Sequence, residues 1–231
     1  MDAVATLLAS LDVRTLHGGC TGAVFVAFDK LRPGEALVVV SAHAPKKLLG
    51  RLQDERPGLF EWSPLGAGPA VWRTRLDRRD AAPGAKRGVS EALSWDHDRL
   101  EQLDLSVFEA RRAGDYAAAG SAFAEFDLGL RRHIHFEEEI LFPVFEERTG
   151  QPAHGGPTGV MRAEHREIEA LLEGLDEVAE LPGQAAEILR EDLVRILGWH
   201  NQKEESVLYP GVDTLLSDDE KDTLVRRIQS S

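Results

Sequence analysis

Cysteine is nearly absent from this chain, because Cys20 is the single example among 231 residues. One cysteine excludes a disulfide-stapled scaffold and a zinc module built on thiolates. Basic residues are also scarce, with 27 lysines and arginines against 40 acidic residues and a formal net charge of -13. Phosphate backbones need clustered basic side chains, so this balance argues against a nucleic-acid-binding protein.

Long apolar runs are missing as well. No stretch approaches the roughly 18 residues that a membrane-spanning helix needs, so no membrane association is expected. The N-terminus carries Asp2 and no basic segment, which is unlike a signal peptide, and the cytoplasm is the expected compartment. Hydrophobic residues make up 42% of the chain, which is enough to bury real cores. The length suits one large domain or two small ones.

Two regions of different composition follow each other along the chain. The first, residues 1–76, contains short β-branched runs and turn residues, whereas residues 90–231 contain long, acid-rich amphipathic stretches. Between them, residues 77–89 combine Pro83, Gly84 and Gly88 with mixed charge. That composition is typical of an exposed linker, so the sequence predicts two domains.

The first region predicts a small two-layer α/β domain. Strands are expected at residues 11–14, 37–41, 59–62 and 71–76, and helices at residues 23–31 and 45–53. The turn before the last strand is expected around Gly66-Ala67-Gly68-Pro69. The resulting order, β-α-β-α-β-β, predicts a sheet with helices on one face.

The second region predicts an all-α, up-down four-helix bundle. Short breakers separate four long helical stretches: Gly114-Asp115, then residues 150–159, then Pro182-Gly183. Connections this short favour antiparallel neighbours. Ser217 and Glu220 form a capping-box pattern, which predicts a short additional helix near the C-terminus.

One face of every long helix combines apolar residues with a histidine, and two of the four helices add a glutamate one turn later. On the second helix, His133 and Glu137 lie in an apolar stripe with steps of three and four residues. On the fourth, His200 and Glu204 are followed on the same stripe by Val207. The complete set of polar residues on the stripes is His97, His133, Glu137, His165, His200 and Glu204.

These six side chains would destabilise a bundle core unless something compensates them. An unpaired carboxylate in an apolar core costs several kcal/mol or more, and an unsatisfied imidazole also costs free energy. Metal ions compensate both groups, and the i to i+4 spacing puts a histidine and a glutamate on one helix face. A glutamate can then bridge two ions while each histidine binds one. Nitrogen and oxygen ligands without sulfur favour a non-haem iron pair over manganese or zinc.

Three other histidine–glutamate pairs have the same spacing. Their glutamates include Glu101 and Glu169, which fall near the margins of their stripes at about 100° per residue. We expect both to be solvated or to lie behind the ligands, with a role as an additional ligand as the alternative. His135 lies about 200° from His133 and is predicted to face outward together with Glu139.

The registers of these motifs resemble the hemerythrin or HHE cation-binding domain. The matching segments are DHDRL, HIHFEEEILFP, EHREIEALL and HNQKEESVLYP, over roughly residues 90–215. The resemblance implies an oxo- or hydroxo-bridged di-iron centre in a four-helix bundle, with the six side chains as its ligands. Oxygen-carrying hemerythrins have a histidine where this chain has Glu169, and an aspartate five residues after the last histidine instead of Glu204 at four. The pattern is more similar to the repair-of-iron-centres branch and related iron- or NO-responsive proteins.

The first region resembles an uncharacterised α/β domain that is often found beside hemerythrin domains and whose fold is similar to that of the SirA/TusA sulfur carriers. The resemblance rests on LDVRTL, AFDKLRPGE, SAHAPKKLL, GLFEW and GPAVWRTRL. Of the family's Asn-Asp-His-Asp-Pro turn, this chain keeps His43 and Pro45, and Cys20 lacks the following proline of the sulfur-carrier motif. We expect Cys20 to be a small packing residue and His43 to cap a turn or a helix start.

The expected function is that of a cytoplasmic non-haem di-iron protein that binds O2, NO or a related small ligand, in sensing or scavenging under gas, iron, oxidative or nitrosative stress. Catalysis is not required, and the protein or redox partner is not identified by the sequence. One alternative is enzyme-like: reduction of peroxide or NO, or donation of iron to damaged centres. A second alternative makes the bundle structural and the N-terminal domain the working part, as a docking or sulfur-handling module that uses Cys20 or His43.

Overall fold

The computed structural model describes residues 8–16, 20–68, 70–82, 86–153 and 155–230. The chain divides into two compact units, Met1–Lys86 and Arg87–Gln229. Strand β4 (Trp72–Arg78) is the last element of the first unit, and helix α3 (Val89–Arg112) is the first element of the second. The segment between these elements is therefore shorter than the predicted linker of residues 77–89, because the strand continues to Arg78.

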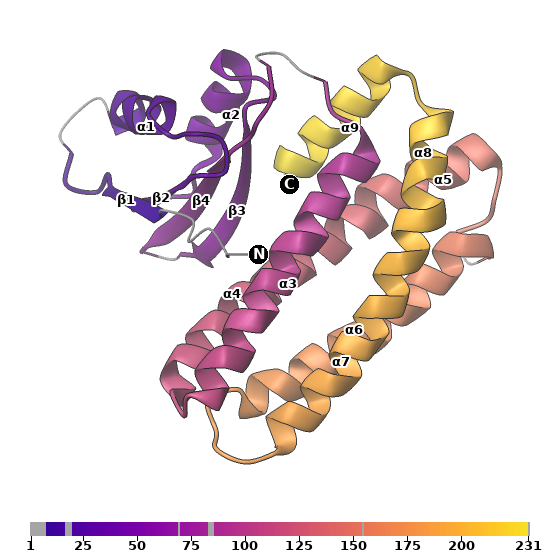
Figure 1. Cartoon of the computed structure of the whole chain (residues 1–231). Coiled ribbons are helices and arrows are strands. Elements are labelled where there is room, and N and C mark those ends of the chain that lie inside the picture. The colour runs from indigo at the N-terminus through magenta and orange to yellow at the C-terminus, as the bar shows by residue number, and fades with distance from the viewer. Residues whose placement is uncertain (1–7, 17–19, 69, 83–85, 154, 231) are drawn as a thin grey trace. The chain divides into compact units, whose positions relative to one another are not determined.

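The first unit is a four-stranded sheet with two helices (Figure 1). Its elements before β4 are β1 (Leu8–Asp12), α1 (Cys20–Asp29), β2 (Ala36–Ser41), α2 (Lys46–Glu55) and β3 (Phe60–Ala67). The strand order is β1-β2-β4-β3, in which β1 and β2 are parallel and the other pairs are antiparallel. The parallel pair needs a crossover connection, which α1 provides. The predicted β-α-β-α-β-β order is confirmed.

Both helices of the first unit pack on one sheet core. Phe28 of α1, Leu52 of α2, Leu37 and Val39 of β2, and Leu76 of β4 belong to the same buried cluster. The first four residues of β2 are all buried, which accounts for its continuous apolar run where a strand with one exposed face would alternate.

The predicted turn before β4 is wrong in its position. Gly66 and Ala67 belong to β3, which continues past a register shift between Pro64 and Gly66. This irregularity lets a strand that contains a proline and a glycine remain paired with its neighbour. The chain turns at Gly68, whose φ of 64° is a conformation that glycine adopts without steric cost. Pro69 lies outside the described residues.

The second unit is an up-down four-helix bundle followed by a short helix, which confirms the predicted architecture (Figure 1). Two bundle helices are uninterrupted, namely α3 and α6 (Gly156–Val178). The other two each contain a π-helical turn, and they run as α4 (Tyr116–Phe136), η1 (Glu137–Leu141) and α5 (Phe142–Thr149), and as α7 (Ala185–Lys203), η2 (Glu204–Leu208) and α8 (Tyr209–Leu215). The last helix is α9 (Asp218–Ser230). Among the described residues, no helix is both long and apolar enough to cross a membrane.

Each π-helical turn starts at a glutamate and ends before an aromatic–proline pair, Phe142-Pro143 or Tyr209-Pro210. Proline has no N–H and cannot donate the α-helical hydrogen bond to the fourth residue back. At both places the aromatic residue donates its N–H to the carbonyl five residues back, that of Glu137 or Glu204. The wider turn brings the aromatic residue back over the helix face that carries the glutamate.

The π-helical turn in the fourth helix makes the predicted stripe wrong beyond Glu204. Val207, which was expected to be buried, is 62% exposed, whereas Leu208 and Tyr209 are buried. A stripe read with the α-helical period assumes about 100° per residue, and one additional residue in the turn moves every later side chain to a different face.

The first turn of α3 is capped from α8. The carboxylate of Asp213 accepts hydrogen bonds from the backbone N–H groups of Val89, at 2.8 Å, and Ser90, at 3.1 Å. The N-cap residue of α3 is Gly88, which has no side chain that could do this. A carboxylate at a helix N-terminus also interacts favourably with the helix dipole, so Asp213 stabilises the start of the bundle.

Candidate metal centre

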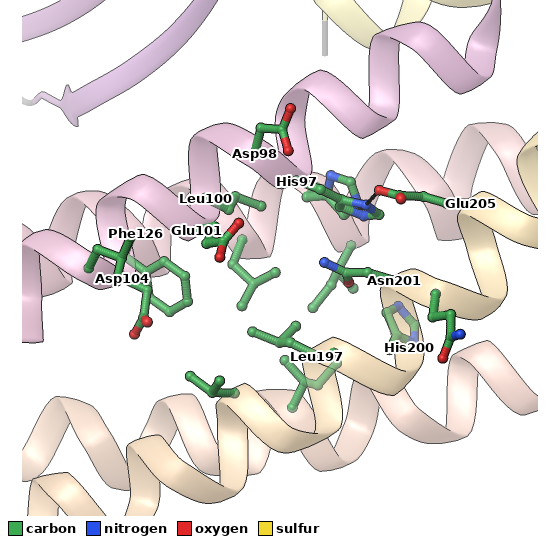
Figure 2. A pocket seen from close by; sticks show the side chains of 18 of the residues that line it. His97, Asp98, Leu100, Glu101, Asp104, Phe126, Leu197, His200, Asn201 and Glu205 are labelled. Atoms are coloured by element: carbon green, nitrogen blue, oxygen red, sulfur yellow. Dashed lines mark hydrogen bonds and ion pairs between the residues drawn. The ribbon is translucent and has the colours of Figure 1, made fainter. Parts of the chain in front are cut away.

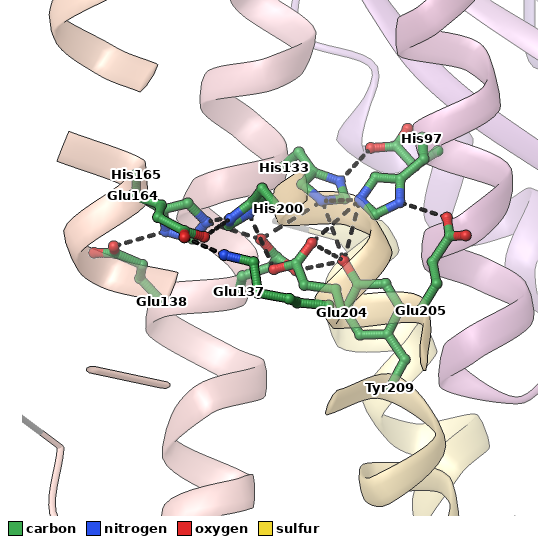
Figure 3. Close-up of polar contacts among 12 residues, drawn as sticks. His97, His133, Glu137, Glu138, Glu164, His165, His200, Glu204, Glu205 and Tyr209 are labelled. Carbon is green, nitrogen blue, oxygen red and sulfur yellow. Dashed lines mark hydrogen bonds and ion pairs between the residues drawn. The ribbon is translucent and has the colours of Figure 1, made fainter. Parts of the chain in front are cut away.

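All six polar side chains on the predicted stripes come together inside the bundle (Figure 3). None of them is more than 6% exposed. They are His97 of α3, His133 of α4, His165 of α6, His200 of α7, and Glu137 and Glu204, the first residues of η1 and η2. Figure 3 shows the two glutamates between two pairs of imidazoles.

The imidazoles form two pairs whose Nε2 atoms face each other. The Nε2 atoms of His97 and His133 are 3.1 Å apart, and those of His165 and His200 are also 3.1 Å apart. Each pair joins two helices that follow each other along the chain, α3 with α4 and α6 with α7. The nitrogens therefore define two positions inside the bundle.

Each glutamate reaches both imidazole pairs. Glu137 Oε2 lies 3.5 Å from His133 Nε2 and 3.3 Å from His165 Nε2. The carboxylate of Glu204 lies 3.4 Å from His97 Nε2 and 3.1 Å from His200 Nε2. This arrangement suits a carboxylate that bridges two ions.

The separations match those of neighbouring ligands on one metal ion. Metal–ligand bonds of about 2.1 Å place two adjacent ligands of an octahedral ion about 3.0 Å apart. Two carboxylate oxygens, Glu137 Oε2 and Glu204 Oε1, are buried without a hydrogen-bond partner. Buried carboxylate oxygens of this kind need a compensating charge. The residues therefore fit a pair of metal ions, one at each imidazole pair, and the nitrogen and oxygen donors suit non-haem iron.

Two of the imidazoles have their Nδ1 atom beside the carboxylate of the glutamate that directly follows Glu137 or Glu204 in the sequence. His97 Nδ1 lies 2.7 Å from an oxygen of Glu205, and His165 Nδ1 lies 2.9 Å from an oxygen of Glu138. Both contacts cross the bundle, because Glu138 belongs to η1 and Glu205 to η2.

The other two imidazoles are held by the acid that precedes a histidine on the neighbouring helix. His133 Nδ1 lies 2.9 Å from Asp96, and His200 Nδ1 lies 3.0 Å from Glu164. Asp96 also accepts a hydrogen bond from Nε of the buried Arg99, at 2.8 Å. Glu164 is half-buried and forms an ion pair with a lysine of α7.

The four outer carboxylates select one tautomer for the four imidazoles. A hydrogen on Nδ1 donates to the carboxylate and leaves the Nε2 lone pair directed at the centre. The sequence prediction did not identify these carboxylates, which are Asp96, Glu138, Glu164 and Glu205. Their signal in the sequence is the repeated order of an acid before the first histidine of each half and a second glutamate after each bridging one.

When metal is not bound, protons on the imidazoles balance the negative charge of the buried carboxylates. Burial lowers the pKa of His200, but the adjacent Glu204 carboxylate, followed by Glu137 and Glu164, outweighs burial and raises the pKa to about 9. The same balance raises the pKa values of His97 and His165. Metal ligands must be deprotonated, so bound ions would take the place of these protons.

Tyr209 is a further polar residue of the centre that the sequence prediction missed. Its hydroxyl donates to Glu137 Oε1 at 2.6 Å or to Glu204 Oε2 at 2.9 Å, and lies 3.2 Å from His97 Nε2 and 3.4 Å from His133 Nε2. Burial, followed by the charges of the two glutamates, raises the pKa of this phenol well above its ordinary value. An α-helical period does not place residue 209 on the ligand face, whereas the π-helical turn does.

The two marginal glutamates are not brought into the centre. Glu101 is exposed at the edge of a pocket, and Glu169 is half-buried. Among the described residues, the groups whose atoms are close enough to hold a metal contain neither of them. His135 is exposed, as its angular position predicts, and so is Glu139.

Of the two residues singled out in the first unit, His43 belongs to none of the groups among the described residues that could hold a metal. His43 is exposed, and its carbonyl accepts a hydrogen bond from the Ser41 hydroxyl at 2.8 Å. Helix α2 starts after Pro45 without a side-chain cap, so His43 does not cap this helix, and its role as the cap of a turn stays a prediction. Cys20 is the first residue of α1, and its side chain lies outside the part of the chain that the structure describes.

A pocket of about 480 Å³ leads from the surface between α3 and α7 to the imidazoles of His97, His133 and His200 (Figure 2). Its inner walls are apolar and come from Leu100, Phe126, Leu130, Ile134, Ile168 and Leu197. Asp104 of α3 and Arg190 of α7 also line it and form an ion pair, with Arg190 Nε 2.8 Å from Asp104 Oδ1. A water molecule occupies about 30 Å³ of liquid, so the pocket admits molecules well above the size of a diatomic gas.

Comparison with known proteins agrees with the geometry. The first unit matches the family described as an uncharacterized conserved protein, DUF2249, over residues 10–78. No curated protein and no solved structure gives a significant match to the chain. The second unit matches the family model described as the hemerythrin HHE cation binding domain over residues 89–212, from the first residue of α3 into α8. This match covers more than half of the chain and contains the whole histidine–glutamate cluster, so the chain belongs to the hemerythrin HHE cation-binding family.

Proposed function

We propose that the bundle binds two iron ions and, through them, O2, NO or a related small ligand, in sensing or scavenging under gas, iron, oxidative or nitrosative stress. Glu137 and Glu204 bridge the ions, and each imidazole pair holds one of them. The observation that carries the proposal is the orientation of the four imidazoles, in which each Nδ1 faces a carboxylate and each Nε2 faces the centre. Carboxylate–histidine–metal arrangements of this kind fix the ligand tautomer and increase its basicity.

A bound iron pair would supply exchangeable coordination positions and electrons for the chemistry of a small ligand. The chain itself orients the imidazoles and packs apolar side chains on two sides of the centre. Phe136, Phe142 and Met161 belong to the apolar cluster on one side of the centre, and Leu130 and Ile168 to the cluster on the other. Because these clusters exclude water, ligands are expected to enter through the pocket between α3 and α7.

The lining of the pocket supports a neutral ligand. The inner walls are apolar, whereas Asp98, Glu101 and Glu205 line the pocket with negative charge. Like charges repel, so this lining disfavours anions and leaves O2, NO and hydrogen peroxide as the better matched molecules. The proposal includes no nucleic-acid or membrane partner, and it places the protein in the cytoplasm.

The size of the pocket supports a second candidate, an enzyme-like role. A volume of about 480 Å³ lies within the range of pockets that hold drug-sized molecules, and it exceeds the need of a gas sensor. Reduction of a peroxide or of NO at the centre, or release of iron toward damaged centres, would use this additional space.

Metal content and an absorption spectrum of the aerobically purified protein test the proposal. We expect about two irons per chain and oxo-to-iron charge-transfer bands, as mixed nitrogen and oxygen ligation favours iron. Metal-free protein loaded in parallel with iron, manganese and zinc salts shows the preference. A folded protein that takes up no metal would overturn the proposal.

The reduced protein then separates the two candidate functions. Stable adducts with O2 or NO, without turnover, favour sensing or scavenging. Repeated consumption of NO or hydrogen peroxide in the presence of a chemical reductant favours the enzyme-like role. A variant that lacks a bridging glutamate is the control in both assays, because it keeps the pocket and loses the centre.

A further inference from the structure

Tyr209 and Phe142 occupy equivalent places beside the centre, but Tyr209 alone of the two carries a hydroxyl. In the structure each bridging glutamate is followed, five residues later, by an aromatic residue, which is Phe142 after Glu137 and Tyr209 after Glu204. The Phe142 ring stacks on His165, with centroids 5.6 Å apart, and the Tyr209 ring packs beside His97, with centroids 5.7 Å apart. Both rings are completely buried.

Packing alone does not account for the hydroxyl. Phe142 fills the equivalent volume beside His165 with an apolar ring, so an apolar ring would also fill the space beside His97. Burying a hydroxyl costs free energy unless it finds partners. The Tyr209 hydroxyl finds four neighbours, all of them atoms of the proposed metal ligands, and Figure 3 shows it pointing into the centre.

A single hydrogen cannot satisfy these four neighbours once metal is bound. A phenol has one hydrogen to donate. Metal-bound imidazoles are neutral, and their Nε2 lone pairs face the ion, so neither His97 nor His133 can donate to the phenol oxygen through Nε2. The lone pairs of oxygen and nitrogen that are left facing each other require a cation between them.

The distances place the phenol oxygen among the ligands of one ion. It lies 3.2 Å and 3.4 Å from the Nε2 atoms of His97 and His133, and 2.6 Å and 2.9 Å from oxygens of Glu137 and Glu204. These values bracket the separation of about 3.0 Å between adjacent ligands of an octahedral ion. Tyrosine oxygen is an established type of iron ligand in proteins.

We propose that the Tyr209 oxygen is a ligand of the ion held by His97 and His133, so that the two ions have unequal sets of protein ligands. This inference rests on the proposed metal centre. When the oxygen–metal bond forms, the O–H bond breaks and the proton leaves to solvent, as it does for other protonated ligands. The ion at His165 and His200 has the Phe142 ring in the equivalent place and no such ligand.

The tyrosine content of the chain makes the inference directly testable. The chain contains two tyrosines, so a Tyr116→Phe variant leaves Tyr209 as the single source of any tyrosinate signal. Tyr116 is the first residue of α4, and the guanidinium of Arg111 lies over its ring, 5.4 Å from the centroid. Metal-free Tyr116→Phe protein is loaded with ferrous ammonium sulfate without oxygen, oxidised in air, and measured by visible absorption and resonance Raman spectroscopy.

We expect a tyrosinate-to-iron charge-transfer band with enhanced tyrosinate ring modes in both the native protein and Tyr116→Phe. Iron-loaded protein that lacks these modes would overturn the inference and leave the metal centre intact. A chain that binds no iron would overturn the proposed function and this inference with it. Iron content measured on the same samples separates the two failures.

The complementary variant is Tyr209→Phe, which copies the arrangement at Phe142. We expect it to bind iron but to lose the tyrosinate band completely, and retention of the band would contradict the inference. If this variant does not fold, Tyr116→Phe still decides the question. Zinc loading of Tyr116→Phe provides a redox-independent readout, because tyrosinate formation changes its ultraviolet difference spectrum, whereas an unchanged spectrum would count against a phenol ligand.

Discussion

The two halves of the bundle carry the same donors in the same order. The first half consists of α3, α4, η1 and α5, and the second of α6, α7, η2 and α8. Each half has an acid–histidine pair on its first helix, then a histidine and two consecutive glutamates, and then an aromatic–proline pair. Each half also supplies carboxylates that hold imidazoles of the other half, as Glu138 does for His165 and Glu205 for His97.

The halves differ in what surrounds these donors. His133 is held by the buried Asp96, which is itself bound by Arg99, whereas His200 is held by Glu164, which is half-buried. The aromatic residue after the π-helical turn also differs, with a phenol in the second half and a plain phenyl ring in the first. The shared donors would thus hold two ions, and the unequal neighbours would give each ion its own environment.

Removal of Glu137 or Glu204 should have the largest effect on metal content, because each of these carboxylates lies between the imidazoles of the two halves. Each of these carboxylates reaches imidazoles of both halves, so Glu137→Ala and Glu204→Ala should each lose most of both ions. Metal analysis after dialysis measures the loss. The controls are Glu101→Ala and Glu169→Ala, which should keep the native content, and equal losses in all four variants would contradict the placement of the bridges.

Removal of a histidine should affect one ion position and spare the other. His133→Ala removes a nitrogen from the first position, and His165→Ala removes one from the second. We expect each variant to retain a single ion per chain, since the other imidazole pair and both carboxylates remain. Titration of metal-free protein with iron, followed by Mössbauer spectroscopy, distinguishes the retained positions. Loss of both ions from either variant would show that neither position can be filled without the other.

Substitution of an outer carboxylate should reduce stability more in the first half than in the second. Burial raises the pKa of Asp96, but the charge of Arg99 and the hydrogen bond of His133 outweigh burial and hold it well below its ordinary value. Asp96→Asn leaves a buried arginine unpaired, so it should lower metal affinity about 10- to 100-fold and the free energy of unfolding by about 3–5 kcal/mol.

The matched variant in the second half is Glu164→Gln, in which a partly exposed carboxylate changes. It should also weaken metal binding, but it should change the free energy of unfolding by less than about 1 kcal/mol, as is usual for exposed ion pairs. Chelator competition measures affinity, and urea unfolding of the metal-free proteins measures stability. Equal losses of stability in both variants would show that the burial of Asp96 has no energetic consequence.

A phenol placed in the first half should have the smallest of these effects on metal binding, because it removes no donor. Phe142 is completely buried against His165, so the new hydroxyl of Phe142→Tyr must fit into a filled space. An unpaired buried hydroxyl costs about 1–3 kcal/mol, which should appear as a lower urea midpoint of the metal-free protein. Unchanged stability would mean that the first half also has a polar partner for a phenol, and that packing does not enforce the difference between the halves.

Most residues of the candidate metal centre could be predicted from the α-helical period, because they lie in or directly after α-helical segments. His133, Glu137, His200 and Glu204 were predicted on buried stripes, and the structure buries all of them. The prediction fails at the next turn, where Val207 is exposed and Tyr209 is buried. The failure has a local cause, since a proline that cannot donate a hydrogen bond accompanies a turn with a different period.

The outer carboxylates could not be assigned from one helix at a time. Their contacts run between helices, and the spacing within a single helix says nothing about which acid of a neighbouring helix meets an imidazole. In the first unit, a similar limit applies to the strand that contains Pro64 and Gly66. Residues that usually end a strand were read as the turn, whereas pairing with β4 continues the strand to Ala67.

The Asp213 cap has a topological consequence. The carboxylate holds the first residues of α3 from within α8, so the beginning and the end of the two-half array are adjacent. The donors stand in the same order in both halves, and each half also holds an imidazole of the other through Glu138 or Glu205. Because the cap joins the start of the first half to the end of the second, we expect a chain in which the second half came first to bring the same donors together.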